Sequence, residues 1–319
     1  MRVDEMKVEG WEKEWVKKWL IHCDEKDIYP WEWDFKQCYV SKEEYDRNTA
    51  IANILKYKNF EFISGKEEFN ITGEAGKNAD CDKEAFPMYA LLGWQKKPED
   101  IIRGDAMNSY KTTFTTAMTR AKRSDSRYKD ICDAIGIDLN EKLWNQAETL
   151  YDENNYRAFD WIAENEEGFS RFAKLTHTIG NFTVLPHWMN TGRASLGDYW
   201  DLALKSLYDF LNPINAGAWI GLIEKYKLQV FVNNNYEVEE FWKGHFSKGS
   251  KPSTSKEVGQ FLRCVNLSIT ERGKHMVKAL CDSLGETSYG FYEELKNLKE
   301  PKFANELWVE EKSGNCTEV

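Results

Sequence analysis

The segment from Leu175 to Leu211 places the strongest limits on how this chain can fold, because two patterns of different period follow one another in it. Residues 181–185 (NFTVL) are typical of a short strand, and Pro186 ends it because proline cannot donate to a strand ladder. From about residue 197 to Leu211 the apolar residues recur at helical spacing, and this pattern stops before Pro213. The segment therefore predicts a small β element around residues 181–185 and a helix after it.

Helical patterns dominate the rest of the chain. Trp11, Trp15 and Trp19 lie at i, i+4 and i+8, which predicts an amphipathic helix that docks on the body of the protein or, alternatively, binds a partner. Residues 28–35 are expected to be extended, 64–84 to form a long loop or hairpin, 227–232 to form a strand, and the tail after Pro301 to be loosely held. Further helices are expected near 41–58, 86–94, 98–122, 126–135, 140–151, 155–174, 216–228 and up to Leu284. We therefore expect a mainly α (α+β) fold.

The polar segment SKGSKPSTSK at 247–256 is the clearest candidate for a linker, because it contains no large apolar residue. It divides the sequence into a main helical domain, residues 1–246, which would contain the functional site, and a helical C-terminal extension, residues 256–319, packed on it. A single domain over the whole chain is the alternative.

Charge and cysteine content limit the class of function. The net charge of −10 over 319 residues argues against sequence-independent binding to nucleic acid, which relies on a basic surface. A nuclease is still compatible with this charge, because a divalent metal and a few arginines can supply positive charge locally. A protein partner is equally compatible. The seven scattered cysteines and the absence of a signal-like or membrane-spanning apolar stretch predict a cytoplasmic protein with reduced thiols.

Two side chains at the entry of the predicted strand could carry chemistry. His177 precedes Asn181 by four residues, and Gly180 between them permits a sharp backbone approach. A histidine at a strand end can act as a general base or as a metal ligand, with a neighbouring amide fixing its orientation. We therefore assign His177 and Asn181 as candidate catalytic residues.

Polar residues after the strand could bind a phosphate and a metal ion. Asn190 and Arg193 lie in a polar loop, where the guanidinium could hold a phosphate or a carboxylate. Asp198 and Asp201 lie at the start of the next helix and are candidate metal ligands. Alternatively, both carboxylates only cap that helix.

A second polar cluster lies at Ile101–Phe114, in the sequence IIRGDAMNSYKTTF. Arg103, Asn108 and Ser109 could bind substrate and Asp105 could bind a metal if this segment completes a pocket with residues 181–201. Alternatively, the same side chains cap a helix and form ion pairs in its first turn.

The same two segments carry a resemblance. Leu175–Asp201 resembles the IGN-(F/L)-T-x-L element of an uncharacterised bacterial protein family, and RGDAMNSYKTTF resembles another segment of that family. A more distant similarity is to the HNH-type C-terminal domain of modification-dependent (type IV) restriction endonucleases, with Ile179–Thr183 matching a strand and Asn190 a later asparagine. That resemblance implies a general-base histidine and a metal that polarises the scissile phosphate. Residues 140–176 contain no histidine, so His177 would take this role.

Two hypotheses of different class follow from these patterns. The first is an HNH-like nuclease or phosphodiesterase that acts against foreign DNA and uses a divalent metal such as Mg²⁺ or Mn²⁺. The second is a non-catalytic binding or regulatory protein that keeps the scaffold and recognises a protein or a small ligand.

Overall fold

The computed structural model describes residues 10–35, 85–94, 102–108, 110, 113, 117, 160–186, 200–239 and 254–313. Within these ranges the chain is mainly α-helical, as the sequence predicts, with one two-stranded antiparallel sheet. The helices predicted at 41–58, 126–135 and 140–151, the 64–84 loop and most of the 247–256 segment lie outside the described residues.

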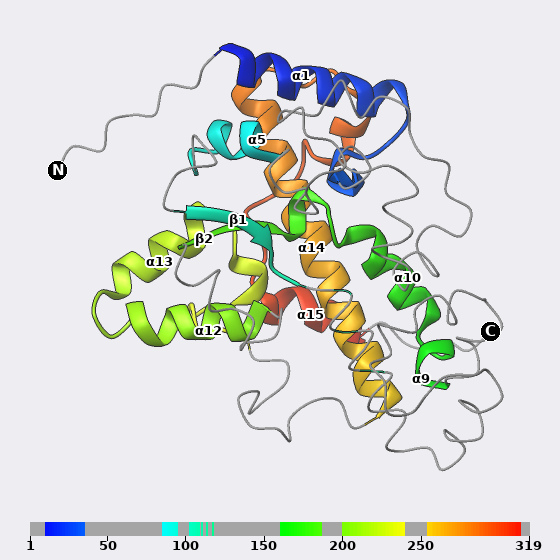
Figure 1. Ribbon diagram of the computed structural model, residues 1–319, viewed down its shortest axis with the longest axis vertical. Helices are drawn as coiled ribbons and strands as arrows, with labels where there is room; N and C mark the ends of the chain where they lie inside the picture. The colour runs from blue at the N-terminus through cyan, green and yellow to red at the C-terminus, as the bar shows by residue number, and fades with distance from the viewer. Residues whose placement is uncertain are drawn as a thin grey trace.

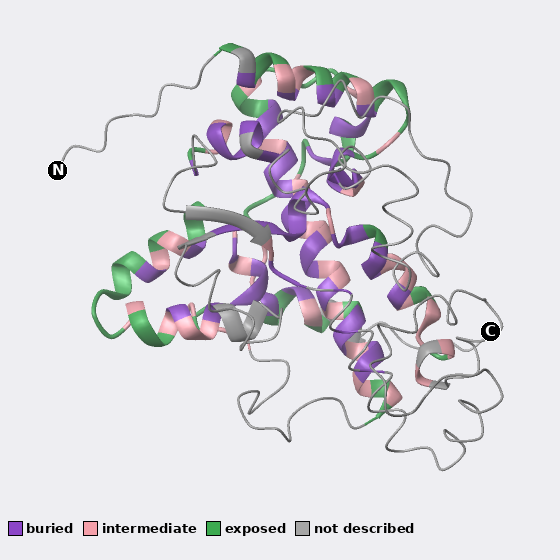
Figure 2. Cartoon of the chain, viewed as in Figure 1, coloured by how far each residue is buried: buried purple, intermediate pink, exposed green. Residues whose placement is uncertain are grey.

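The central element is helix α14 (Ser255–Leu284), around which the other described elements are arranged (Figure 1). The hydroxyl of Thr254 accepts a hydrogen bond from the backbone N–H of Glu257 and caps the first turn. Gly285 ends the helix with a φ of 71°, a left-handed conformation that glycine adopts without strain. Because α14 is buried on several sides along its length, it forms the centre of the core (Figure 2).

The N-terminal tryptophan pattern forms a docked helix. Helix α1 (Gly10–Glu25) buries Trp19 completely and packs beside α5 (Phe86–Leu91). The predicted extended segment at 28–35 contains a short 3₁₀ turn, η1 (Pro30–Glu32), with extended residues on both sides of it. Trp31 is 1% exposed and η1 lies against α14, so this part of the chain belongs to the core.

The sheet joins two segments that are distant in sequence. Helices α9 (Asp160–Ala163) and α10 (Glu166–Leu175) lead through the 3₁₀ turn η6 (Ile179–Asn181) into strand β2 (Phe182–Pro186). Strand β1 (Ile102–Ala106) pairs with β2 in antiparallel register, with Ala106 opposite Phe182 and Ile102 opposite Pro186. The helix predicted for 98–122 is therefore wrong over β1, because backbone pairing with a distant strand outweighs the local preference there.

The chain continues through a helical hairpin, α12 (Trp200–Leu211) and α13 (Ala216–Lys225), close to the predicted helices at about 197–211 and 216–228. The strand predicted at 227–232 is instead the 3₁₀ turn η8 (Gln229–Phe231), followed by a single bridge from Val232 to Val238. Val230, Phe231 and Val232 are all buried, and a turn can direct consecutive side chains inward whereas a strand alternates them.

The segment after Pro301 is packed, contrary to the expectation of a loose tail. Helix α15 (Ala304–Ser313) buries Leu307, and the indole N–H of Trp308 donates to the hydroxyl of Ser268 on α14 at 3.0 Å. The backbone N–H of Ala304 also donates to the carbonyl of Val232. None of the helices in the described part of the chain combines the length and apolar character that a membrane crossing requires.

Candidate functional site

His177 lies in the turn after α10, beside the segment that follows η1. Its backbone carbonyl accepts a hydrogen bond from the N–H of Phe35 at 3.0 Å, which holds residues 34 and 35 against it. The imidazole Nδ1 lies 4.0 Å from Oδ1 of Asp34, whose side chain is 3% exposed. The His177 side chain is 21% exposed, and its Nδ1 is buried.

This arrangement can support proton transfer. A carboxylate on the Nδ1 side favours the imidazole tautomer with its proton on Nδ1, which leaves Nε2 as the proton acceptor. At 4.0 Å the contact is longer than a hydrogen bond, so Asp34 acts on the ring through its charge. The pair therefore has the composition of a general base and a carboxylate that can stabilise its protonated form.

Asn181 has a different environment from the one predicted. Its Nδ2 donates to the carbonyls of Asn108 and Thr176 at 2.9 and 2.8 Å, and its Oδ1 accepts from the backbone and side-chain N–H groups of Asn108, both at 3.1 Å. An amide can donate two hydrogen bonds and accept two, so all of its capacity is used within the protein. Asn181 is also 0% exposed. Its side chain therefore links the turn before β2 to the residue that follows shortly after β1, and the residue beside Nδ1 of His177 is Asp34.

The described parts of the two polar segments, residues 102–108 and 181–186, lie side by side. The register places Asp105 opposite Thr183 and Arg103 opposite Leu185, and the N–H of Met107 donates to the carbonyl of Asn181 at 2.7 Å. Backbone pairing brings these two segments together. At one end, a hydrogen bond between the side chains of Asn108 and Asn181 also joins them. The side chains of Arg103 and Asp105 are outside what the structure describes.

Several predicted site residues cannot be placed. Ser109, Asn190, Arg193 and Asp198 lie outside the described residues, and only the backbone of Asp201, in the first turn of α12, is described. Across the described ranges no group of three or more His, Cys, Asp or Glu side chains could hold a metal ion. The metal ligands named from the sequence, Asp105, Asp198 and Asp201, therefore stay predictions.

The structure explains the glycine at position 180, just before β2. A Cβ atom at this position would lie 2.0 Å from the carbonyl oxygen of Ile269, so the backbone of η6 touches α14 directly. On the α14 side, Gly273 provides a matching surface, and its own Cβ would lie 3.0 Å from that of Trp31. The glycine of the IGN element is thus required by a close approach of two backbones.

Arg272 secures this contact and was not singled out from the sequence. Its Nη1 donates to the carbonyls of Gly180 and Phe182 at 2.8 and 2.5 Å, and its Nε and Nη2 donate to the carbonyls of Tyr226 and Lys227. Burial lowers the pKa of Arg272 from 12.5 to about 9, so the guanidinium is still charged at pH 7. This fully buried cation ties η6, β2 and the end of α13 to α14.

Two sequence signals could have revealed the missed residues. Arg272 continues the apolar stripe of Val265, Ile269 and Met276 at helical spacing, a position where a charged residue must be buried. Asp34 stands between Trp33 and Phe35, and an acid flanked by aromatic residues suggests burial.

Comparison with known proteins identifies no relative. No family model, no curated protein and no solved structure matches this chain.

Proposed function

We propose that this protein is a hydrolase of the HNH-like nuclease or phosphodiesterase type, with His177 as its general base. The observation that carries the proposal is the buried carboxylate of Asp34 beside Nδ1 of a histidine whose side chain is partly exposed. Nε2 of His177 takes a proton from a water molecule whose oxygen bonds to the scissile phosphorus as the P–O bond to the leaving oxygen breaks. Asp34 stabilises the imidazolium that forms until it gives its proton to the leaving oxygen.

The similarity of residues 179–183 to the HNH-type domain of type IV restriction endonucleases supports a phosphodiester of foreign DNA as the substrate. A divalent metal such as Mg²⁺ or Mn²⁺ would polarise the scissile phosphate when bound. The described side chains do not form a site for it, and the ligands we propose are Asp105, Asp198 and Asp201. The candidate substrate contacts are Arg193, Asn190, Arg103 and Ser109, whereas Asn108, which the sequence also suggested, is 0% exposed and hydrogen-bonded to Asn181.

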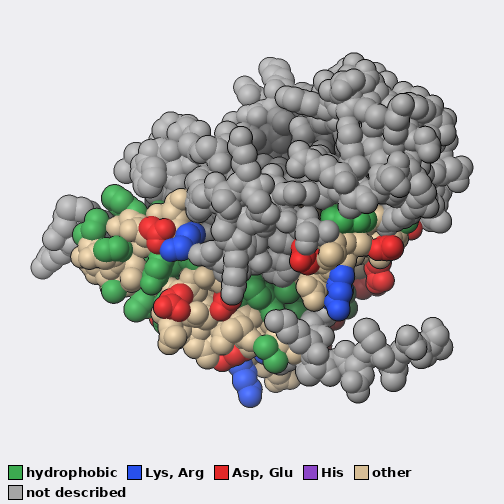
Figure 3. Space-filling view, turned by 90° about the horizontal axis from the view of Figure 1, so that it is seen from below, with side chains coloured by type: hydrophobic (Ala, Val, Ile, Leu, Met, Phe, Trp, Pro, Cys, Tyr) green, Lys and Arg blue, Asp and Glu red, His purple; other side chains and the backbone are tan. Residues whose placement is uncertain are grey.

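The surface charge favours local recognition of a phosphate over broad adhesion to DNA. On the face shown in Figure 3, the described acidic and basic side chains are interspersed, without a continuous basic area. The net charge of −10 agrees with this distribution. A nuclease of this kind would bind its substrate through the reacting phosphate and a few neighbouring groups.

The test is a cleavage assay of plain and base-modified plasmid with Mg²⁺, Mn²⁺ or Ni²⁺, and with EDTA as the metal-free control. We expect metal-dependent cutting, a rate reduced by roughly 100-fold or more in His177→Ala, and a smaller loss in Asp34→Asn. Asp209→Asn on the exposed face of α12 is the matched control and should cut at the wild-type rate.

Two results would overturn the proposal. One is the absence of cutting with every metal and every plasmid by a folded wild-type protein. The other is full activity in His177→Ala, which would move the chemistry elsewhere in the chain.

One observation favours the alternative of a binding or regulatory protein. The amides of Asn108 and Asn181 hydrogen bond to each other, so this part of the IGN element is structural and would persist without catalysis. Under this alternative the wild-type protein and His177→Ala would be equally inactive on all substrates.

A further inference from the structure

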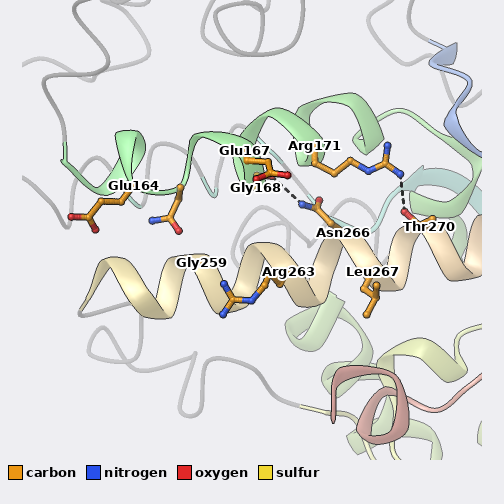
Figure 4. A pocket seen from close by; sticks show the side chains of 10 residues that line it. Glu164, Glu167, Gly168, Arg171, Gly259, Arg263, Asn266, Leu267 and Thr270 are labelled. Atoms are coloured by element: carbon orange, nitrogen blue, oxygen red, sulfur yellow. Dashed lines mark hydrogen bonds between the residues drawn. The ribbon is translucent and has the colours of Figure 1, made fainter. Parts of the chain in front are cut away.

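A groove of about 540 Å³ lies between α10 and α14 (Figure 4). Two glycines, Gly168 on α10 and Gly259 on α14, line its floor, so no side chain from either position fills it. A Cβ at Gly259 would lie 2.5 Å from Oδ1 of Asn165, which shows how closely that amide covers the floor. The volume falls within the usual range of small-molecule sites.

The lining of the groove includes one buried amide oxygen that lacks a donor in the described part of the chain. Asn266 donates through Nδ2 to the carbonyl of Gly168 at 3.0 Å, and its Oδ1 is buried without a hydrogen-bond partner. Asn165 uses its Nδ2 to bind Trp161 and Ser255, and no described group donates to its Oδ1. A buried acceptor without a donor is costly, so Oδ1 of Asn266 is suited to a ligand that carries N–H groups.

The charges around the groove favour a cation. Two exposed carboxylates line it on the α10 side, Glu164 in the turn between α9 and α10 and Glu167 in the first turn of α10. Arg171 at the far end extends toward Thr270 and is neutralised by Glu32, with 2.6 Å between Nη2 and Oε1 (Figure 4). The remaining guanidinium on the lining, that of Arg263, is outweighed by the two exposed carboxylates.

We infer that this groove is a binding site for an organic cation with one or more ammonium groups on an aliphatic chain, such as a linear polyamine or the side chain of a lysine. The ammonium groups donate to Oδ1 of Asn266, to Oδ1 of Asn165 and to the two exposed carboxylates. Leu267 on the α14 wall contacts the methylene groups between them. This site is separate from the proposed catalytic pair, and it stands whether or not the protein is a hydrolase.

The inference is tested by isothermal titration of the full-length protein with spermidine and, in a second arm, with butylamine as a mimic of a lysine side chain. We expect one saturable site for spermidine. Its affinity should fall by about tenfold or more in Asn266→Leu and in Glu167→Gln, and rise in Asn266→Asp, where a carboxylate replaces the amide. Butylamine binding of comparable strength would identify a single lysine as the occupant, and its absence a polyamine.

An acidic protein attracts polycations without a specific site, so a control of equal charge change is needed. Glu25→Gln on the exposed face of α1, away from the groove, should bind spermidine as the wild type does. The inference is overturned if spermidine does not saturate, or if Glu25→Gln and Glu167→Gln weaken binding equally. It is also overturned if Asn266→Leu, shown by circular dichroism to be folded, binds like the wild type.

Discussion

At the scale of single residues, buried polar side chains hold this protein together where the sequence first suggests chemistry. Asn181 and Arg272 are both 0% exposed, and their hydrogen bonds go to backbone carbonyls and, for Asn181, also to Asn108. A buried polar group is tolerated only when its hydrogen bonds are made, and both residues meet this condition. Their removal should therefore affect folding before it affects any chemistry.

Asn181→Ala tests this role. The variant loses four hydrogen bonds and leaves the buried amide of Asn108 without its side-chain partner, so we expect a loss of about 2–4 kcal/mol in the free energy of unfolding. Urea unfolding followed by tryptophan fluorescence measures it. Asn297→Ala, at an exposed position, should change the free energy by less than about 0.5 kcal/mol. Equal stability of the two variants would show that the Asn181 amide does not hold the strands together.

Only one residue of the candidate pair could be predicted from the sequence. His177 could be named from the sequence because it stands beside a strand that is easily recognised. Asp34 could not be named with it, because 143 positions separate the two and tertiary contacts, including the hydrogen bond from Phe35 N–H to His177 O, bring them together. Tertiary contacts of this kind leave no periodic signal in the chain.

At the scale of elements, long stretches with helical periodicity such as α14 were predicted correctly, whereas the short elements β1 and η8 were not. The 30-residue helix α14 was predicted to end at Leu284, and it does, because Thr254 and Gly285 give clear start and stop signals. Strand β1 was missed because Ile102–Ala106 has no strong alternation of its own and becomes a strand through its pairing with β2. The 3₁₀ turn η8 was mistaken for a strand because both can bury a short apolar run.

The crossing of η6 over α14 gives a prediction at this scale. Gly180→Ala would place a methyl group 2.0 Å from the carbonyl oxygen of Ile269, so the two elements must separate. We expect a loss of about 2–3 kcal/mol or more in the free energy of unfolding. Gly221→Ala is the matched control, because this glycine lies on the exposed side of α13 with open space around it. That variant should be about 0.5–1 kcal/mol more stable than the wild type.

Thermal and urea unfolding of the two variants measure both effects. The free energy of unfolding should fall in Gly180→Ala and rise in Gly221→Ala, although both variants add the same methyl group. A Gly180→Ala protein as stable as Gly221→Ala would mean that η6 and α14 do not touch through their backbones.

At the scale of the whole molecule, one hydrophobic cluster includes residues from both ends of the described chain. Trp19 and Cys23 on α1, and Leu280 and Cys281 on α14, are members of it, and all four are 0% exposed. The sequence alone could not show this, because a polar segment at 247–256 has the same composition whether it joins two domains or connects two parts of one core. The division into residues 1–246 and 256–319 therefore needs a test of cooperativity.

Cysteine labelling during unfolding supplies that test. Cys23 and Cys281 are buried in the same cluster, and burial raises the pKa of the Cys281 thiol to about 12, which leaves almost no reactive thiolate in the folded state. We expect iodoacetamide to modify both thiols over the same range of urea concentration, because one cooperative transition exposes them. Mass spectrometry of the digested protein resolves each site, and the partly buried Cys264 should already react in the absence of urea. If Cys281 reacts at a lower urea concentration than Cys23, then the C-terminal helices unfold separately and the two-part division is correct.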